Sequence, residues 1–254
     1  MNLQGKTILI TGGASGIGLE ATKQFLAIGA TVIITGRNEE KLAAVKRAYP
    51  AVIAIKSDVS KEADAKMLFN EVEKLGGIDI LYNNAGVGVS PLNLGIANEK
   101  HFEGAVYEME VNYLGVVRLN NIFMQMLSTK NESAIINTTS ILSIVPSIIE
   151  ATYSSSKAAL SFYTKSLRTH LEIIKSNIKV FELLPPVVDT AMVAERDGKK
   201  LSPQHLVKDL IKGLQKNKYT IRVGDTKTLY YLNRFFPKLA FGLVNAKKYY
   251  NSLK

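Results

Sequence analysis

Short, almost continuous apolar runs alternate with amphipathic stretches along most of the chain. The runs are rich in β-branched and aromatic residues and occupy residues 7–10, 31–35, 51–55, 78–82, 134–139, 178–184 and 219–223. Uninterrupted apolar strands are typical of a parallel sheet that is covered on both faces, because both sides of each strand are then buried. The stretches between them carry apolar residues at helical spacing. The pattern therefore predicts an α/β fold with a seven-stranded parallel sheet and helices on both faces.

The first apolar run leads into a glycine-rich turn. Gly12, Gly16 and Gly18 follow residues 7–10, and a helical pattern begins directly after them. Glycine is needed where the backbone turns with positive φ or where a pyrophosphate comes close, and unpaired amides at the helix start would meet the phosphates. Such a turn can also serve only as a strand-to-helix connector. Its position between a strand and a helix favours the first half of a nucleotide-binding βαβ unit, and hence a Rossmann-like, doubly wound sheet.

Tyr153, Lys157 and Ser140 are candidates for proton transfer. Tyr153 and Lys157 stand at i and i+4, so in a helix their side chains emerge on one face. A lysine charge about 4 Å from a phenolate, at an effective dielectric of about 20, would stabilise it by roughly 4 kcal/mol and bring the tyrosine pKa toward neutrality. Such a phenol can act as a general acid or base. The spacing alone also fits a solvated surface pair.

The size and composition limit the possibilities. A chain of 254 residues without Pro- or Ser/Gly-rich linkers predicts one domain over residues 1–254, with a cofactor-binding half at about 1–130 and a catalytic and substrate half at about 131–254. No cysteine is present for disulfides, and the dispersed His101, His170 and His205 lack metal-ligand spacing, so we expect no metal. No apolar run approaches the roughly 20 residues of a membrane span. We expect a soluble, cytoplasmic protein.

Six motifs occur in a familiar order at familiar spacings. They are TGGASGIG at residues 11–18, Asp58-Val59, NNAG at residues 83–86, Asn112, Ser140 with YSSSK at residues 153–157, and LPPVVDT at residues 184–190. In this respect the chain resembles the short-chain dehydrogenase/reductase family over nearly its whole length. It further resembles the DltE-type oxidoreductases of that family in its opening, in ITGRNEEKL and in LPPVVDT. The resemblance implies strand order 3-2-1-4-5-6-7, with every motif at the carboxyl edge of the sheet.

The resemblance also implies roles for individual residues. Tyr153 would transfer a proton to or from the substrate oxygen, Ser140 would orient that oxygen, Lys157 would lower the tyrosine pKa and bond the nicotinamide ribose, and Asn112 would hold a water beside the lysine. Cofactor contacts are implied at Gly12, Ser15, Gly16, Ile17, Gly18, Arg37, Asp58, Val59, Asn84, Ala85, Gly86, Tyr153, Lys157, Val188 and Thr190. Asp58 also fits a turn residue ahead of a helix cap at Ser60, and Asn83 fits a brace within the sheet.

The end of the second strand bears on the choice of cofactor. A site for NAD usually places a carboxylate there to hold the ribose 2′-hydroxyl, whereas this chain has Gly36 and Arg37. Gly36 leaves room and Arg37 offers a forked cation for a 2′-phosphate, to which Ser15 could add a hydrogen bond. A solvated loop charge is the alternative for Arg37. We therefore expect NADP, with NAD the less favoured cofactor.

Departures from the family pattern lie on the substrate side. Pro186 stands where glycine is usual, so one backbone amide is lost. The apolar residues 141–142 and 144–145 follow Ser140, and together with Val87, Met192 and Val193 they indicate a hydrophobic ketone or aldehyde as the small-molecule carbonyl or alcohol substrate. They could equally be core residues. Residues 189–205 are expected to form a lid.

The remaining features concern partners. Small residues in the helix around Tyr153, together with the resemblance, favour a homodimer or homotetramer. The chain has a net charge of +10 but no motif for binding nucleic acid, so the excess of basic residues fits a solvated surface. A catalytically idle NADP-binding regulator or scaffold is the rival interpretation, against which the intact proton-relay set argues.

The segment 226–254 has no acidic residue and mixes basic with aromatic side chains. We expect it to pack on the body or on a neighbouring subunit, broken into two short helices at Pro237. Weak peripheral membrane contact is the alternative.

Overall fold

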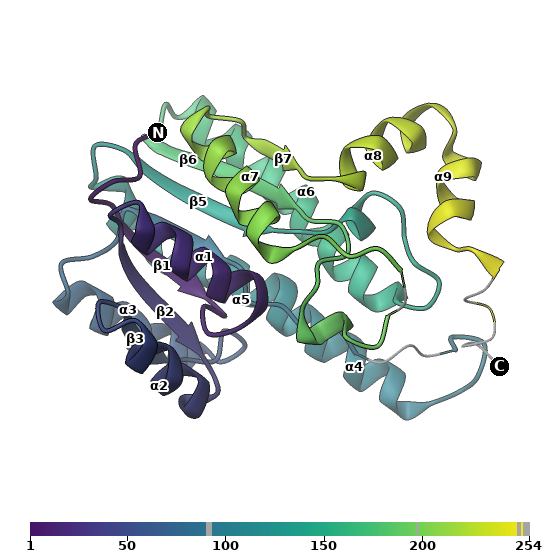
Figure 1. Cartoon of the computed structure of the whole chain (residues 1–254), viewed down its shortest axis with the longest axis horizontal. Helices are drawn as coiled ribbons and strands as arrows, with labels where there is room; N and C mark the ends of the chain where they lie inside the picture. Colours follow the sequence, from purple (N-terminus) through teal and green to yellow (C-terminus); the bar gives the residue numbers. More distant parts are fainter. Residues whose placement is uncertain (90–92, 197, 248–249, 251–254) are drawn as a thin grey trace.

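The computed structural model describes residues 1–89, 93–196, 198–247 and 250. Its centre is a parallel sheet of seven strands in the order β3-β2-β1-β4-β5-β6-β7 (Figure 1). The strands are β1 (Thr7–Thr11), β2 (Thr31–Gly36), β3 (Ile53–Lys56), β4 (Ile80–Asn83), β5 (Ser133–Thr138), β6 (Ile178–Leu184) and β7 (Thr220–Arg222). All neighbouring pairs are parallel. The expected Rossmann-like sheet, including its strand order, is confirmed.

Helices cover both faces of this sheet. They are α1 (Gly16–Ala27), α2 (Glu39–Ala48), α3 (Glu62–Lys74), α4 (Glu99–Met109), α5 (Gly115–Ser128), α6 (Ala151–Ile173), α7 (Pro203–Gln215), α8 (Asp225–Phe235) and α9 (Pro237–Val244). A π-helical turn, Glu110–Leu114, joins α4 to α5, and short 3-10 turns occupy Ile141–Ser143 and Ala191–Val193.

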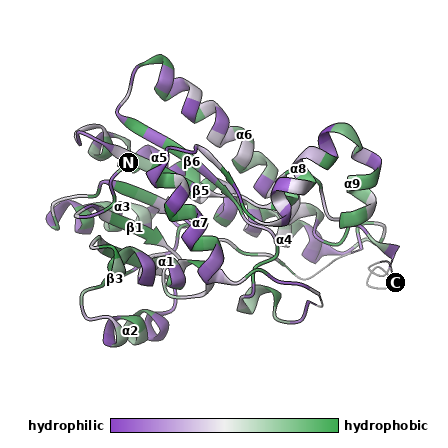
Figure 2. Cartoon of the chain, turned by 45° about the horizontal axis from the view of Figure 1, so that its top comes forward, coloured by the Kyte–Doolittle hydropathy of each residue, from purple (hydrophilic) through white to green (hydrophobic). Residues whose placement is uncertain are grey.

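The alternation of side chains along each strand divides the core into two layers. Ile8 and Ile10 of β1 pack with Phe25 of α1 and with the buried side of α7. Leu9, between them, points to the opposite face and packs with α3 and α5. Successive strand residues point to opposite sides of a sheet, so one apolar run supplies both layers. In Figure 2 the apolar strands accordingly lie between helices whose hydrophilic sides face outward.

The helices begin at recognisable signals. Asn38 caps α2 by accepting a hydrogen bond from Lys41 N, and Ser202 caps α7 by accepting one from His205 N, with Pro203 in the first helical turn. The buried residues of α7 recur every three to four positions along one face. Local sequence thus fixes where these helices start and which side they bury.

The C-terminal segment forms two helices with a break between Phe235 and Pro237. Figure 1 shows α8 and α9 standing beyond the carboxyl end of the sheet, apart from the layered body. The expected break at Pro237 is present. Within the described ranges, every helix is too short or too polar to cross a bilayer.

Candidate functional site

The glycine turn between β1 and α1 has the shape that its sequence predicts. Gly12 and Gly16 have φ values of +66° and +50°, a region that favours glycine. A Cβ on Gly18 would lie 2.1 Å from the carbonyl oxygen of Gly12, so no larger residue fits there. Ser15 precedes α1 in extended conformation without making a side-chain cap, and the first turn contains no acidic residue. The amides of this turn therefore stand open to an anion, which fits the pyrophosphate of a dinucleotide.

The segment after β4 is tied to the end of β1. Thr11 Oγ1 accepts hydrogen bonds from the amides of Asn84 and Ala85, at 3.0 and 2.9 Å. Asn84 Nδ2 donates to the carbonyl oxygen of Thr11 at 3.0 Å. A Cβ on Gly86 would lie 3.2 Å from Lys157 Nζ, so glycine there lets the chain pass close to the lysine. Asn84, Ala85 and Gly86 thus line the space between the glycine turn and the start of α6.

Asn83 has a structural position. Its Nδ2 donates to the Oδ1 atoms of Asn120 and Asn137, both at 2.8 Å, and the side chain is buried. Buried amides hydrogen-bonded to each other in this way join β4 to α5 and β5. Asn83 is therefore part of the scaffold beneath the site.

Ser140, Tyr153 and Lys157 converge at the carboxyl end of β5. Ser140 follows β5, while Tyr153 and Lys157 lie one turn apart near the start of α6. The Ser140 hydroxyl accepts a hydrogen bond from Leu142 N at 3.1 Å and lies close enough to the Tyr153 phenol to lower its pKa. Lys157 is buried, its Nζ lies 5.8 Å from the centroid of the Tyr153 ring, and it donates to the carbonyl oxygen of Thr138 at 3.0 Å. The three functional groups thus meet at one point of the sheet edge.

The protonation of this cluster differs from the expectation. Burial, together with the Glu150 carboxylate, raises the pKa of Tyr153 to about 12, although the Ser140 hydroxyl opposes this rise. Burial lowers the pKa of Lys157 to about 8. The cost of burying a phenolate dominates the pKa of Tyr153, and the hydrogen bond to the Thr138 carbonyl fixes the Lys157 ammonium at the end of β5. At neutral pH Tyr153 keeps its proton.

Asn112 lies in the π-helical turn that separates α4 from α5. Its Oδ1 accepts from Val87 N at 2.8 Å, and its Nδ2 donates to Val87 O at 2.9 Å and to Ser156 Oγ at 3.0 Å. Single π-turns inside α-helices are often found at functional sites. Asn112 therefore joins the loop after Gly86 to α6, where it lies close to Lys157 without a direct bond to it. Ser156 was not singled out from the sequence, in which it is one of three consecutive serines.

Arg37 and Asp58 follow β2 and β3 at the outer part of the site. The Arg37 guanidinium donates a hydrogen bond to the Tyr107 hydroxyl and lies 5.7 Å from the centroid of that ring. Asp58 accepts hydrogen bonds from the amide and the hydroxyl of Ser60, at 3.0 and 2.7 Å, which matches the turn role left open for it. The next residue, Val59, is buried, and its carbonyl oxygen accepts from Arg118 at 2.7 Å. Tyr107 is a contact of Arg37 that the sequence did not indicate.

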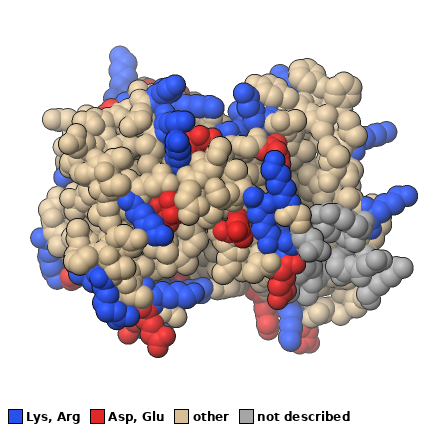
Figure 3. Space-filling model, viewed as in Figure 1, with Lys and Arg blue, Asp and Glu red and all other residues tan. Residues whose placement is uncertain are grey.

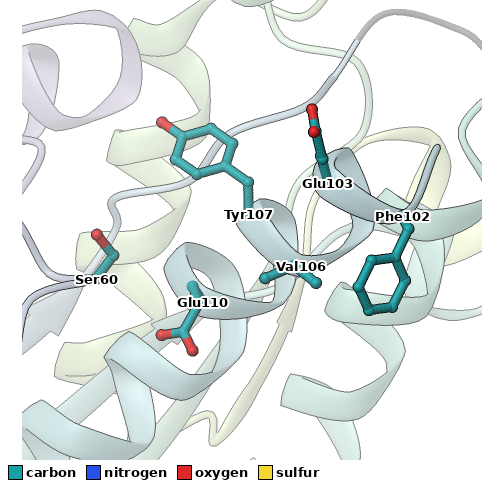
Figure 4. A pocket seen from close by; sticks show the side chains of 6 residues that line it. All are labelled: Ser60, Phe102, Glu103, Val106, Tyr107 and Glu110. Carbon is teal, nitrogen blue, oxygen red and sulfur yellow. The ribbon is translucent and has the colours of Figure 1, made fainter. Parts of the chain in front are cut away.

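Tyr107 also borders an open pocket of roughly 450 Å³ (Figure 4). Its other lining residues are Ser60, Phe102, Glu103, Val106 and Glu110. Most of them project from α4, whereas Ser60 comes from the turn after β3. The pocket thus lies beside the turns that carry Arg37 and Asp58.

The segment after β6 closes over the glycine turn. A Cβ on Gly16 would meet the Thr190 side chain at 3.1 Å, so Thr190 packs directly on that turn. Buried Val188 forms an isolated bridge with Leu201, supported by hydrogen bonds of 2.9 Å from Asp189 N to Leu201 O and from Leu201 N to Val187 O. Ile17, at the start of α1, is partly buried against the core. The two ends of the expected lid are therefore held together by the pairing of Val188 with Leu201, and Thr190 holds the segment against the glycine turn.

An ion pair joins the middle of the expected lid, residues 189–205, to the start of α6. Arg196 forms an ion pair with Glu150, the residue that precedes α6. Glu108 of α4 is fully buried, accepts from Val89 N at 2.9 Å, and has one carboxylate oxygen without a partner. Both carboxylates raise the pKa of Tyr153, Glu150 more than Glu108. No pattern in the sequence indicated that Glu108 of α4 and Glu150 before α6 lie beside the tyrosine.

The apolar residues after Ser140, which were expected to line the substrate site, pack mainly against the C-terminal helices. Val145 is buried against Leu229 of α8 and Ala240 of α9, with Ile141 and Ile144 at the edge of this cluster. Val145 is thus a core residue for the C-terminal helices, which is the alternative that the sequence left open. Met192 is more than half exposed, whereas Val87 packs against the core. Within the described part of the chain no three His, Asp or Glu side chains are grouped to hold a metal ion.

The comparison with known proteins agrees with this architecture. A family model described as short chain dehydrogenase matches residues 6–201. A Bacillus subtilis protein named uncharacterized oxidoreductase DltE is 31% identical over 228 residues, which cover 87% of this chain and 89% of that protein.

Solved structures are similar as well. A short chain dehydrogenase from Burkholderia cenocepacia in complex with NADP has a TM-score of 0.84 and 26% identity, over 96% of this chain and 99% of that one. A 3-ketoacyl-(acyl-carrier-protein) reductase from Brucella melitensis complexed with NADH has a TM-score of 0.76 and 28% identity, over 84% and 91%. The neighbours thus bind nicotinamide cofactors of both kinds.

Proposed function

The chain belongs to the short-chain dehydrogenase family of oxidoreductases, and on this premise we propose that it is an NADP(H)-dependent enzyme that interconverts a carbonyl compound and an alcohol. The observation that carries the proposal is the convergence of Ser140, Tyr153 and Lys157 at the carboxyl edge of the sheet. Ligands of open α/β sheets bind at this edge. When bound there, the nicotinamide supplies or accepts a hydride.

Tyr153 is the proposed proton donor. Its partly buried phenol holds a proton well above neutral pH, and Ser140 beside it offers a second hydroxyl to the substrate oxygen. A protonated phenol suits carbonyl reduction, because the oxygen must gain a proton as the carbon gains a hydride. Lys157, whose pKa is about 8 and whose Nζ lies 5.8 Å from the centroid of the Tyr153 ring, is the proposed group that returns a proton to the tyrosine. Asn112 positions this lysine indirectly, through Ser156 and the Val87 backbone.

The chain's own turns would hold the dinucleotide. Gly12, Ser15, Gly16, Ile17 and Gly18 form the turn whose amides suit the pyrophosphate. The segments after β3 and β4 would hold the adenosine through Asp58, Val59, Asn84, Ala85 and Gly86. The nicotinamide end would meet Val188, Thr190, Tyr153 and Lys157, and Thr190 packs on the glycine turn even though Pro186 replaces the usual glycine.

NADP is favoured over NAD because the turn after β2 lacks a carboxylate. Gly36 ends the strand and Arg37 follows, exposed and bonded to Tyr107. A guanidinium fits a phosphate with paired hydrogen bonds. The hydroxyl and ring of Tyr107 hold Arg37 near the sheet edge, which reduces the entropy lost when it binds an anion.

We propose a hydrophobic ketone or aldehyde as substrate. The support is the apolar sequence near the site: Val87 follows the NNAG segment after β4, Met192 and Val193 follow Thr190, and Ile141 and Ile144 follow Ser140 as partly buried side chains. We also propose a single domain that acts in the cytoplasm as a homo-oligomer. The exposed Phe102 on α4 and Phe162 on α6 offer an apolar face for a second subunit.

An oxidation assay tests this function. NADPH consumption is measured across a panel of apolar ketones, aldehydes and quinones, with polyols and sugars as the contrasting set, and binding of NADPH and NADH is measured in parallel. Turnover of apolar carbonyl compounds with NADPH supports the proposal. Binding of NADPH without turnover of any carbonyl compound contradicts it.

A further inference from the structure

The C-terminal helices carry an apolar strip that the rest of the described chain leaves uncovered. One side of α8 and α9 packs on the body through Leu229 and Ala240. The other side exposes large apolar residues, each between 44 and 67% accessible, which we call the tail patch: Tyr231, Phe235, Phe236, Leu239, Phe241 and Leu243. Six large exposed apolar side chains within thirteen residues are more than scattered surface residues, and such concentrations mark interaction surfaces on soluble domains.

Specific contacts fix the orientation of these helices. Asn245 accepts a hydrogen bond from Ile148 N at 2.8 Å and donates one to Pro146 O at 3.0 Å. The Arg222 guanidinium stacks on the Tyr230 ring, 3.6 Å from its centroid. These inner contacts hold the opposite side of both helices outward. The tail patch therefore has a fixed outward orientation, because turning it inward would break the contacts of Asn245 and Arg222.

Cations surround the tail patch. Lys227, Arg234, Lys238 and Lys247 are exposed, and the sequence from residue 226 to its end contains no aspartate or glutamate. In Figure 3, blue side chains project from the side of the molecule on which Figure 1 places α8 and α9. The patch thus combines apolar side chains with a local excess of positive charge.

This combination suits an anionic bilayer. Phenylalanine and leucine side chains enter the boundary between headgroups and acyl chains, while lysine and arginine meet the acidic headgroups. A second copy of the chain fits less well, because a two-fold contact sets the same surface against itself. Such a contact would gather Lys227, Arg234 and Lys238 of both copies on one interface, where the only carboxylate within the two helices is Asp225 at the start of α8. We propose that α8 and α9 form a docking surface for membranes that contain anionic phospholipid.

Docking would set the substrate side of the enzyme against the lipid. The inner face of α8 and α9 contacts residues 144–148, which follow Ser140 by only a few positions. An apolar carbonyl compound dissolved in the bilayer would then reach the site without crossing water. This consequence rests on the proposed function, whereas the docking itself does not.

Vesicle flotation with the full chain tests the proposal. Vesicles of phosphatidylcholine alone are compared with vesicles that also contain phosphatidylserine, at low and at high salt. We expect binding only to the anionic vesicles, weakened at high salt because screening shortens the reach of charges from about 10 Å at 0.1 M to about 3 Å at 1 M.

Two double variants separate the contribution of apolar surface to vesicle binding from that of positive charge. Phe235→Ser with Leu239→Ser removes apolar surface, and Arg234→Glu with Lys238→Glu reverses charge; each should reduce the bound fraction by about tenfold or more. Matched changes elsewhere, Ile173→Ser with Ile174→Ser at the C-terminal end of α6 and Lys208→Glu with Lys212→Glu on α7, should leave binding near the wild-type level. Thermal melts check that each variant is folded, and single substitutions replace any double variant that melts early.

Three results of the flotation experiment would overturn the proposed docking surface. Failure of the wild type to bind anionic vesicles, or equal losses in tail and control variants, overturns the docking surface. If instead the tail variants dissociate an oligomer that ignores vesicles, the patch is a contact between copies, and the proposal is also overturned. Because flotation needs neither cofactor nor substrate, its result does not depend on whether the proposed enzyme activity is found.

Discussion

Lys157 Nζ donates a hydrogen bond of 3.0 Å to the carbonyl oxygen of Thr138, so the ammonium on α6 is fixed at the end of β5. The lysine is almost completely buried, and burial lowers its pKa to about 8. A single carbonyl dipole is a weak substitute for water around a charge. The position of this lysine therefore costs stability, which is typical of a group retained for its chemistry.

Lys157→Met should consequently make the protein more stable at neutral and acidic pH. The folded pKa lies below the unfolded one, so the unfolded state binds more protons between about pH 8 and 10.5, and the stability of the wild type rises with pH across that window. The gain in the variant, about 3 kcal/mol as an upper bound, is fully present below pH 8 and shrinks as the pH approaches 10.5. Denaturant titrations at pH 6.5 and pH 10 measure it.

The exposed Lys165→Met on the same helix is the control, for which we expect little change at either pH. A Lys157→Met protein that is less stable than the wild type at pH 6.5 would show that the bond to Thr138 outweighs the cost of burial.

Arg37→Ala should weaken NADPH binding by about 10- to 100-fold while NADH binding changes little. A charge-assisted hydrogen bond to a phosphate is worth about 1.5–3 kcal/mol, and a ribose hydroxyl offers no counterpart. Fluorescence titration with both cofactors measures the ratio. Lys41→Ala, an exposed cation in the following helix, is the matched control. Equal losses for the two cofactors would remove Arg37 from the proposed 2′-phosphate site.

Glu150→Gln should lower the pKa of Tyr153. The Glu150 carboxylate is the second-largest cause of the raised pKa, after burial, and its removal also leaves the positive charge of Arg196 nearby. Alcohol oxidation needs the phenolate, so its rate rises as the pH approaches the pKa of Tyr153. We expect that rise to begin at lower pH in the variant than in the wild type. Glu172→Gln, at the far end of α6, should leave the pH profile unchanged.

Much of the fold could be predicted from the sequence because its signals are local. Apolar runs such as residues 31–35 and 178–184 mark strands, and Pro237 marks a helix break. The motifs likewise predicted that Ser140, Tyr153 and Lys157 lie together. These features depend on short stretches of chain whose geometry is nearly the same wherever they occur.

Other features depend on contacts between distant segments. Tyr107 meets Arg37 and Glu108 lies beside Tyr153 only because α4 packs next to α6 and near the turn after β2. The spacing of Tyr153 and Lys157 predicted that the two side chains share a helix face, but the direction of the ammonium is set by Thr138. The pKa of Tyr153 therefore could not be derived from the spacing.

The most direct test of the central claim is the turnover of Tyr153→Phe with NADPH and a carbonyl substrate found in the screen. The substitution removes one hydroxyl from a partly buried ring, so the fold and the affinity for NADPH should be kept. We predict that kcat falls by about 10²- to 10⁴-fold, the usual contribution of a positioned general acid, with little change in the Kd for NADPH. Turnover within a few-fold of the wild type would contradict the assignment of Tyr153 as the proton donor.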